Sequence, residues 1–399
     1  MKILQVHNFY RIPGGECSVV RAEEQLLVGR GHTVDRFACD SAAIDTLGLR
    51  DKIGLFLGIP YNKRIFRAVV AAVRARKPDV AHVHNVFPML SPSVYAALRY
   101  CGVPVVQTLH NYRFLCPNGQ FFVAGTICED CQTKGFHSAV LKRCMRGSRV
   151  TSALYALAIY RAWKSGILPN AIDRYIALNN FVAEKMTAGG VPRDRIAICG
   201  NYIESAASPI ADKQGYILYI GRLSAEKGVE TLFRALSLLG GIVLKVAGSG
   251  PEEERLKSEA HKLDGAQVQF LGHISGRDKQ RVIAEALCTV VPSEWYENFP
   301  VAVLESMSLG TPVVASKMGG LPDMIEHGVN GMLFEAGNYV DLANCIQTIV
   351  KDSLGKQHMA EQAMAMAIAK FGPEEHYRRL MEIYQDAISE NNAIAVTEK

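Results

Sequence analysis

The pattern of apolar and polar positions is the same in both halves of this chain. In the first half, short apolar runs at residues 3–6, 80–83 and 103–109 are each followed by a turn and a stretch of helical spacing. The second half repeats this pattern from residue 216 to residue 334. Strands that alternate with helices predict parallel sheets covered by helices, the α/β class of fold.

The second half predicts six strands and five helices in alternation. The strands are expected at 216–220, 242–246, 268–271, 289–291, 312–315 and 332–334, and the helices at 229–239, 252–263, 278–287, 321–327 and around Glu305. A run of mostly small residues at 204–211 is typical of a linker. Because 399 residues exceed the size of most single cores, we expect two domains.

The composition is that of an ordinary globular protein, with 49% apolar and 21% charged residues. No run approaches the roughly 20 apolar residues of a membrane-spanning helix, and the first residues lack the apolar core of a signal peptide. We therefore expect a cytoplasmic protein. The net charge of +5 is too small to indicate a nucleic-acid partner.

The positive charge is concentrated in two stretches of the first half. Residues 50–77 contain eight basic residues and one acidic residue, and residues 134–164 contain seven basic residues and no acidic one. Both stretches also carry aromatic and aliphatic side chains. This mixture suits an anionic membrane surface or a lipid diphosphate, and it is equally typical of two solvated helix faces.

Two glutamates eight residues apart, Glu297 and Glu305, stand out in the second half. The segment between them is mostly apolar or small, and Pro300 suits the first turn of a helix. Glu297 is then expected in the loop before the helix, and Glu305 one to two turns inside it. The free N–H groups of such a helix start form a natural phosphate site. The alternative is a structural role, in which Glu305 pairs with a lysine or arginine of the core.

Four further loops follow predicted strands at the same sheet edge as Glu297. They lie at 221–228, 247–251, 271–274 and 318–323. The first carries Arg222 and Lys227, two cations that complement phosphate, and the others are rich in glycine. Taken singly, each of these loops can be an ordinary turn between a strand and a helix. Ligands of parallel sheets bind beyond the carboxyl ends of the strands, so the loops together predict a phosphate-binding edge.

In the first half, each of the three predicted strands ends in a His-Asn pair, at residues 7–8, 84–85 and 110–111. We expect these pairs to converge on one crevice, although a single histidine in such a place is more often structural. Gly14 and Gly15 follow the first strand, ahead of a helix that is expected to begin near Glu16. Paired glycines let the backbone approach a ligand closely.

Ten cysteines are many for a protein of a reducing compartment. Four fall in one loop-like region, namely Cys116, Cys128, Cys131 and Cys144. The gap of two residues between Cys128 and Cys131 lets both sulfur atoms reach one tetrahedral ion. The spacing predicts a structural zinc site in an insertion at 112–150, and free thiols are the alternative.

These residues suit the departure of a nucleoside diphosphate from a sugar. Arg222, Lys227 and the helix start after Glu297 would neutralise a diphosphate, so no cofactor is expected for catalysis. Fixed charges that stabilise a leaving group dominate such a step. Glu305 can accept hydrogen bonds from ribose hydroxyls, and Glu297 from hydroxyls of the sugar. His110, from the other domain, is expected to face the sugar and the acceptor.

The combination resembles glycosyltransferase family 4, a retaining group with the GT-B fold. The likeness extends over nearly the whole chain, and its most specific part is the pair of glutamates together with the loop that carries Arg222 and Lys227. It implies two Rossmann-like domains facing a cleft, with the acceptor bound by residues 1–205 and the nucleotide sugar by residues 212–372. It further implies that a last helix, within 373–399, crosses back to the first domain.

The resemblance also implies roles for individual residues. His110 and Glu297 are implied to be catalytic. The implied donor-binding residues are Gly15, Arg222, Lys227, Gly250, His273, Ile274, Asn298, Phe299, Pro300, Val301 and Glu305. The chain departs from the family pattern at Asn179-Asn180, where a serine is common. The cysteine-rich insertion resembles that of only a subset of the family.

The implied activity is retaining transfer of a hexose from a UDP- or GDP-sugar to a saccharide or lipid-linked acceptor, in surface polysaccharide or lipopolysaccharide biosynthesis. The basic stretches favour a peripheral position on the inner face of the plasma membrane. Two alternatives stay open. One is a catalytically silent partner subunit that binds sugar nucleotides, and the other is a GT-B sugar epimerase.

Overall fold

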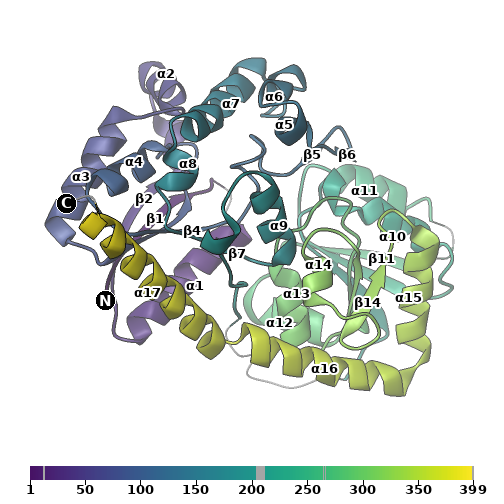
Figure 1. Ribbon diagram of the computed structural model, residues 1–399. Coiled ribbons are helices and arrows are strands. Elements are labelled where there is room, and N and C mark those ends of the chain that lie inside the picture. The colour runs from purple at the N-terminus through teal and green to yellow at the C-terminus, as the bar shows by residue number, and fades with distance from the viewer. Residues whose placement is uncertain (12–13, 204–211, 264, 266, 398–399) are drawn as a thin grey trace. The chain divides into compact units, whose positions relative to one another are not determined.

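The computed structural model describes residues 1–11, 14–203, 212–263, 265 and 267–397. The predicted linker at 204–211 and Pro13 of the predicted glycine turn lie outside these residues. The chain divides into two compact units (Figure 1). The first comprises residues 1–123, 128–200 and 376–399, and the second comprises residues 124–127 and 201–375.

A six-stranded sheet forms the centre of the first unit. Its strands lie in the order β2-β1-β3-β4-β7-β8, and all neighbouring pairs are parallel. They are β1 (Lys2–Phe9), β2 (Thr33–Asp40), β3 (Val80–Asn85), β4 (Val105–Thr108), β7 (Arg174–Ala177) and β8 (Ile196–Ile198). Strand β3 is buried at every position, whereas the edge strand β2 has no buried residue.

Helices pack on this sheet and continue into the cysteine-rich insertion. They are α1 (Gly15–Gly29), α2 (Leu49–Gly58), α3 (Lys63–Arg76), α4 (Ser93–Tyr100), α5 (Asp130–Thr133), α6 (His137–Leu141), α7 (Arg149–Lys164), α8 (Ile167–Asn170), α9 (Asn180–Ala188) and α17 (Pro373–Thr397). The short elements are η1 (Ser41–Thr46), η2 (Arg193–Arg195), β5 (Phe122–Val123) and β6 (Thr126–Ile127).

Helix α17 completes the core of the first unit. From His376 onward its residues belong to this unit, although they follow the whole of the second unit in sequence. Its buried side chains form one apolar cluster with residues of four sheet strands. The cluster includes Leu380, Ile383, Tyr384 and Ala387 of the helix and Ile3, Val80, Val106 and Ile176 of the sheet.

The second unit contains a second parallel six-stranded sheet, in the order β11-β10-β9-β12-β13-β14. Its strands are β9 (Tyr216–Ile220), β10 (Val243–Ala247), β11 (Gln267–Gly272), β12 (Cys288–Val291), β13 (Val313–Ser316) and β14 (Gly331–Phe334). Each lies within one residue of its predicted position. The two parallel sheets confirm the predicted α/β class.

The helices of the second unit are α10 (Val229–Leu236), α11 (Glu253–Ala260), α12 (Gly276–Ala284), α13 (Val301–Ser308), α14 (Leu321–Met324), α15 (Tyr339–Lys351) and α16 (Ser353–Phe371), with a short η3 (Ala225–Lys227). Most are shorter than predicted, and α14 ends at Met324 instead of reaching residue 327 because Ile325 is in the extended conformation. None of the described helices combines the length and hydropathy that crossing a bilayer requires.

Candidate active site

The loops that follow β9, β10 and β11 are joined by backbone hydrogen bonds. The N–H of Gly221 donates to the carbonyl of Ala247 over 3.0 Å, and the N–H of Gly248 donates to the carbonyl of Gly272 over 2.7 Å. A third bond, of 3.0 Å, runs from the N–H of Leu223 to the carbonyl of Ser249. The predicted loops therefore share one edge of the second sheet.

Two of the glycines in these loops are required by close backbone packing. A Cβ atom on Gly250 would lie 2.1 Å from the carbonyl oxygen of Leu223, and one on Gly248 would lie 1.9 Å from that of Gly221. Gly248 also has a φ angle of +138°, which L side chains rarely adopt. The loop after β10 thus supports the loop that carries Arg222.

Arg222 and Lys227 lie on the loop and short η3 helix after β9. Arg222 is exposed, and in the described part of the chain its guanidinium makes no hydrogen bond or ion pair. The Lys227 ammonium lies 2.7 Å from Glu297 Oε1 and 4.9 Å from the centre of the Trp295 ring. The sequence predicted that Lys227 and the helix start after Glu297 bind one diphosphate, but it did not predict this direct ion pair.

Glu297 is held in place by contacts on both its side chain and its backbone. Only 3% of the residue is exposed. Its Oε1 atom accepts a hydrogen bond from the Ser293 hydroxyl over 2.5 Å, in addition to the Lys227 contact. Its carbonyl oxygen accepts the N–H of Gly320 over 2.8 Å, and a Cβ atom on Gly319 would lie 2.2 Å from that oxygen. The loop after β13 thus fixes Glu297.

Helix α13 begins one residue after Pro300, which the sequence placed in its first turn. Pro300 is the N-cap residue, in an extended conformation, and Val301 is the first helical residue. Asn298 and Phe299 are 8% and 7% exposed, and the Phe299 ring packs edge-on against Phe371. The backbone N–H groups at this helix start follow Glu297 directly, as a phosphate site requires.

Glu305 lies in the middle of α13, where its carboxylate pairs with the Lys279 ammonium of α12 at 2.6 Å. This is the ion pair that we considered as the structural alternative for Glu305. Its side chain is still 22% exposed, so a ligand hydroxyl can reach it. His273 and Ile274 follow β11, with His273 exposed and Ile274 half-buried.

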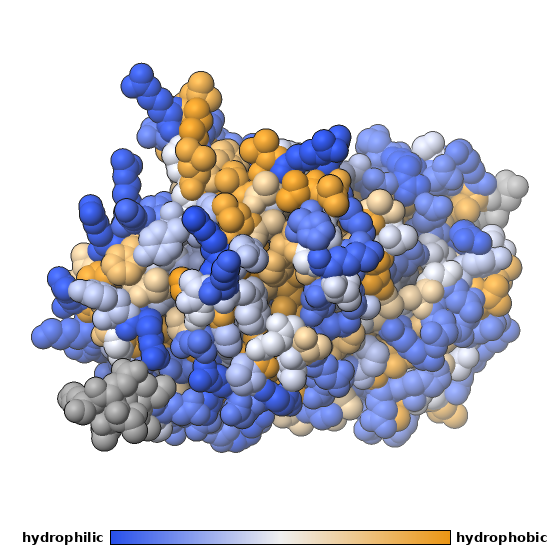
Figure 2. Space-filling model, turned by 45° about the horizontal axis from the view of Figure 1, so that its top comes forward, coloured by the Kyte–Doolittle hydropathy of each residue, from blue (hydrophilic) through white to orange (hydrophobic). Residues whose placement is uncertain are grey.

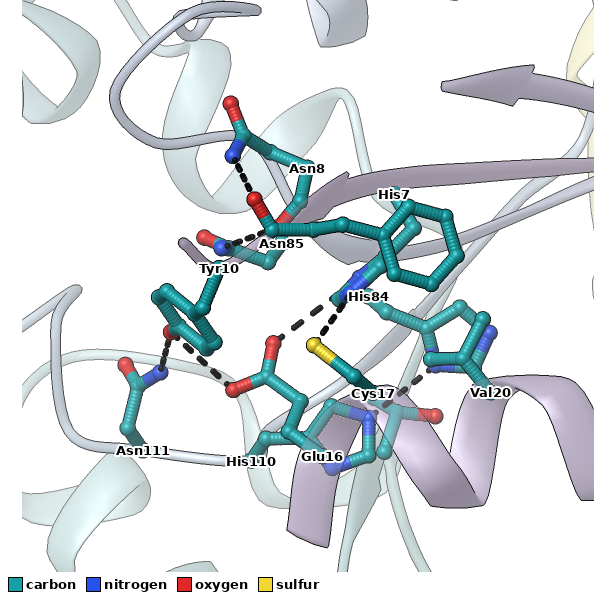
Figure 3. Close-up of polar contacts among 12 residues, drawn as sticks. His7, Asn8, Tyr10, Glu16, Cys17, Val20, His84, Asn85, His110 and Asn111 are labelled. Carbon is teal, nitrogen blue, oxygen red and sulfur yellow. Dashed lines mark hydrogen bonds and ion pairs between the residues drawn. The ribbon is translucent and has the colours of Figure 1, made fainter. Parts of the chain in front are cut away.

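In the first unit, polar side chains gather where β1 ends and α1 begins (Figure 3). Gly15 is the first residue of α1 and is exposed. The Glu16 carboxylate lies between Tyr10, whose hydroxyl donates to it over 3.1 Å, and His7, whose Nδ1 is 3.9 Å away. Asn111 in turn donates to the Tyr10 hydroxyl over 3.5 Å.

The three predicted His-Asn pairs do converge. His84 Nδ1 lies 3.0 Å from His110 Nε2, and the Asn85 amide donates to the carbonyl of Asn8 over 3.0 Å. His7 and His84 are buried, whereas His110 is partly exposed. Of the three histidines, His110 is therefore the one that a ligand can reach, and the others support it.

Burial sets the protonation of this region. It lowers the pKa of His110 to about 3 and, with Arg36 and Arg21, that of His7 to about 4, so both rings are neutral at pH 7. Burial also raises the pKa of Glu16 to about 7, against the opposing effects of the Tyr10, Arg113 and Asn111 contacts. Perturbed groups of this kind are enriched at functional sites.

Behind His84 lies a buried carboxylate, Glu23. Its Oε1 atom is 2.8 Å from His82 Nδ1 and 3.5 Å from His84 Nε2, and its Oε2 atom is 3.4 Å from His376 Nε2. Burial alone would raise the pKa of Glu23, but His82 and His376 outweigh it and hold the pKa well below its usual value. The pKa of His376 rises to about 10 because Cys199 and Glu23 outweigh its own burial. Glu23 is thus an anion that helps to fix the histidines.

Sequence reasoning missed several of these residues. Glu23 and His82 were not singled out. From the sequence alone, a glutamate within a helix is expected to face solvent, and the contacts of Glu23 with β3 and α17 become visible only in the folded structure. Glu16 was noted only as the start of a helix. Ser293 and Trp295 precede Glu297 within four residues, and that proximity was the one available signal.

The four cysteines of the insertion lie near one another, but among the described residues no three of their sulfur atoms all lie within 4.8 Å of one another. Cys116, Cys128, Cys131 and Cys144 all line one small cavity. They lie in the first unit.

Two family models match the chain and together extend over residues 13–366. The model described as "Glycosyltransferase Family 4" matches residues 13–206, and the model described as "Glycosyl transferases group 1" matches residues 202–366.

Three individual relatives are similar to this chain, two of them over about half of its length. An uncharacterized glycosyltransferase of Methanocaldococcus jannaschii is 30% identical over 45% of this chain and 47% of its own length. The lipopolysaccharide 1,6-galactosyltransferase of Escherichia coli is 28% identical over 54% of this chain and 62% of its own. The phosphatidyl-myo-inositol mannosyltransferase of Mycobacterium leprae is 23% identical over 97% of both chains. The chain thus spans about half the length of the first of these relatives.

Among solved structures, the fold matches HepE of Anabaena in complex with UDP-glucose. The TM-score is 0.65 at 19% identity, over 98% of this chain and 99% of that one. This likeness confirms the GT-B fold. The matched models, the relatives and the fold agree: the chain belongs to the group 1 glycosyltransferases of family 4, as its sequence motifs suggested.

Proposed function

We propose that this protein is a retaining glycosyltransferase that moves a hexose from a UDP- or GDP-sugar to a saccharide or lipid-linked acceptor. The observation that carries the proposal is the arrangement around Glu297. A buried carboxylate and a lysine ammonium, 2.7 Å apart, stand at the start of α13, where glycine-packed loops from neighbouring strands meet.

The diphosphate of the donor would bind to this edge of the second sheet. The exposed guanidinium of Arg222 and the ammonium of Lys227 supply positive charge, and the N–H groups at the start of α13, up to Val301, supply hydrogen-bond donors. When the bond between the anomeric carbon and the phosphate oxygen breaks, the electron pair stays on the phosphate. Fixed donors that stabilise this charge lower the barrier.

Glu297 has two tasks in this proposal. Its Oε1 atom is occupied by Ser293 and Lys227, so the lysine is held where a phosphate can share it. The carboxylate can also accept hydrogen bonds from hydroxyls of the donor sugar. Glu305 would bind the ribose by exchanging part of its contact with Lys279, and His273 and Ile274 would flank the base.

In the first unit, His110 would lie beside the transferred sugar as a neutral hydrogen-bonding group, since burial holds its pKa near 3. Gly15, which has no side chain, would let the start of α1 approach a donor phosphate. Both assignments rest on the family pattern, and the contacts of His84 and Glu16 support them by fixing the surrounding geometry.

A lipid-linked acceptor is supported by the surface of the first unit. A groove of about 830 Å³ is lined mainly by apolar and aromatic side chains from the insertion and α7, including Phe136, Leu157, Tyr160 and Trp163. Apolar side chains on α2, α6 and α7 are exposed, and hydrophobic and hydrophilic residues lie side by side on the face drawn in Figure 2. The stretches 50–77 and 134–164, to which these helices largely belong, are rich in basic residues. This mixture suits an anionic membrane surface on the cytoplasmic side.

Relatives support the classes of donor and acceptor. HepE was solved with UDP-glucose, and the names of the Mycobacterium and Escherichia relatives describe transfer of mannose and galactose to a phospholipid and to lipopolysaccharide. These names support our proposal that the reaction belongs to surface polysaccharide or lipopolysaccharide assembly.

The test is incubation of the purified protein with UDP- and GDP-sugars, with and without a lipid-linked saccharide, followed by NMR of the new anomeric centre. We expect transfer with retention. Loss of a donor that stabilises the leaving group typically costs about 10²- to 10³-fold in rate, so Arg222→Ala and Glu297→Ala should lose activity on this scale. Lys262→Ala, at a side chain that is 66% exposed, is the matched control.

Two outcomes would overturn the proposal. Folded Arg222→Ala and Glu297→Ala variants as fast as the parent would remove the assigned site. Release of a free sugar isomer without an acceptor would identify an epimerase instead.

A further inference from the structure

The cysteine-rich insertion contains a cluster that sugar transfer does not use. Cys116 and Cys144 are 28 positions apart in the chain, yet they line the same cavity as Cys128 and Cys131. Cys128 directly precedes Glu129 and α5, Cys131 lies in α5, and Cys144 follows α6. Folding thus brings four thiols from four short segments to the lining of one cavity.

The size of this cavity limits what it can hold. Its volume is about 10 Å³, which is close to the space of a single water molecule or ion. Besides the cysteines, the cavity is lined by Asn118, Phe122, Val123, Ser138, Ala139 and Lys142. An organic ligand is too large for it.

The sulfur atoms already interact with one another. The thiols of Cys116 and Cys131 share a hydrogen bond, and Cys131 also interacts electrostatically with Cys128 and Cys144. In addition, the Cys116 thiol donates a hydrogen bond to Asn118 Oδ1 over 2.9 Å.

The chain around Cys116 is shaped for this contact. The N–H of Gly119 donates to the carbonyl of Cys116 over 2.7 Å and closes a tight turn. Gly119 has a φ angle of +76°, in the left-handed region that favours glycine. The turn holds Asn118, whose side-chain oxygen accepts from the Cys116 thiol, beside that sulfur atom.

Positive charge stands beside the cluster. The Lys142 ammonium lies 3.1 Å from the Cys128 sulfur and 2.7 Å from Asp130. A zinc ion with four thiolates carries a net charge of about −2, and a neighbouring ammonium compensates part of it.

The sulfur atoms must move inward to close a site. Among the described residues, Glu23, His82 and His84 form the only group of three or more potential ligands whose atoms all lie within 4.8 Å of one another. Zinc–sulfur bonds are about 2.3 Å long, so binding requires rotations of the cysteine side chains that bring the sulfur atoms closer together. The free thiols of the four residues leave these rotations open.

We propose that Cys116, Cys128, Cys131 and Cys144 bind one zinc ion. With four thiolates the coordination is complete, so the ion is structural. It ties α5, α6 and the turn after Cys116 together. Because Cys131 also lines the apolar groove between the insertion and α7, the ion would hold one wall of that groove.

The test measures metal directly and does not depend on the proposed activity. The full chain is purified without a histidine tag, and its zinc content is measured by mass spectrometry. We expect about one equivalent, and we expect cobalt added to the zinc-depleted protein to give the absorption bands of a tetrahedral thiolate site. Under half an equivalent together with no cobalt signal, or a disulfide within the cluster, would overturn the proposal.

Variants identify the ligands. Cys131→Ser should lose most of the zinc, whereas Cys101→Ser, at a cysteine outside the cluster, should keep it. Cys144→His replaces the thiolate by an imidazole that can also bind zinc, so this variant should keep the metal. It therefore shows that substitution within the cluster does not remove zinc merely by unfolding the protein. Zinc retained equally by Cys131→Ser and Cys101→Ser would show that the metal lies elsewhere.

Discussion

Glu16 has a carboxyl group that is half protonated near neutral pH, although it lies at the surface end of α1. Its side chain is 11% exposed, and its partners, Tyr10 and His7, are neutral at that pH. Removal from water therefore outweighs the hydrogen bonds that favour the ionised form. We therefore expect Glu16 to make the stability of the first unit depend on pH.

The substitution Glu16→Gln tests this dependence. Since the folded pKa is raised from 4.5 to about 7, the proton binds more tightly to the folded chain. The resulting stabilisation is complete below pH 4.5 and is lost as pH rises through about 7. With about 1.4 kcal/mol per pKa unit, the parent should lose about 3 kcal/mol relative to the variant by about pH 8.

Denaturant unfolding of parent and variant at low and high pH measures this difference. Glu254→Gln, at a side chain that is 89% exposed, should follow the parent at both values. If the free energy of unfolding changed equally with pH for the parent and for Glu16→Gln, the buried environment assigned to Glu16 would be contradicted.

At the scale of secondary structure elements, the glycine loops link backbone packing to the donor site that we propose. The loop after β10 contacts the loop that carries Arg222 so closely that Gly250 has no room for a side chain. The alanine methyl group would displace the backbone at Leu223, next to Arg222.

We therefore expect Gly250→Ala to weaken nucleotide binding by at least about tenfold, because a shift of about 1 Å at a positioned group costs up to about 10²-fold. Calorimetry with UDP and GDP measures the loss. Gly240→Ala is the matched control, since no atom lies within 4 Å of the Cβ it would add. Equal affinity for both variants would disprove the role of this loop.

Helix α17 is an element whose contribution is mainly apolar. Leu380 is fully buried in the cluster against the first sheet. We expect Leu380→Ala to destabilise the protein by about 2–5 kcal/mol, the usual cost of a leucine-sized cavity. Thermal unfolding gives the measurement, and Glu382→Ala on the exposed side of the helix should have a small effect. A small effect of Leu380→Ala would indicate that the helix is not part of the core.

The sequence predicted the buried elements better than the edges. Strands β9 and β12 were recognised because unbroken apolar runs are typical of the interior of a parallel sheet. Strand β2 was missed because Thr33, Asp35 and Arg36 interrupt its apolar pattern at an exposed edge. Helix ends were misplaced by a few residues, since the local signals that stop a helix are weak.

At the candidate site, residue types and spacing predicted that the loops converge. They did not predict which side chains contact one another. Lys227 and Glu297 were both singled out, yet their contact depends on how β9 and β12 lie side by side. Glu23 meets His82, His84 and His376 only through the tertiary fold, because these partners lie between 59 and 353 positions away in the chain. Pairings over such distances leave no periodic signal in the sequence.

At the scale of the whole molecule, charge and exposed apolar surface gather on the first unit. Leu49 and Leu57 of α2 are 76% and 68% exposed, and Val150 of α7 is 72% exposed, in segments that carry many basic residues. We expect the protein to sediment with anionic liposomes and to be released by high salt, because screening weakens attraction to the lipid charge.

The double substitution Leu49→Ser with Leu57→Ser should reduce this sedimentation severalfold. Leu238→Ser, at a leucine of the second unit that is 46% exposed, is the matched control. Binding that ignores lipid charge and salt would count against a membrane role for this surface.

Helix α17 is the last of the described elements to be synthesised, yet its side chains complete the apolar core that also contains Ile3 of β1. While the ribosome is still adding residues 201–375, the nascent first unit leaves the sheet around Ile3, Val80 and Val106 uncovered. Apolar surface exposed in this way attracts chaperones and favours aggregation. Production of soluble protein should therefore depend more on chaperone supply than it does for proteins whose domains are completed one after the other.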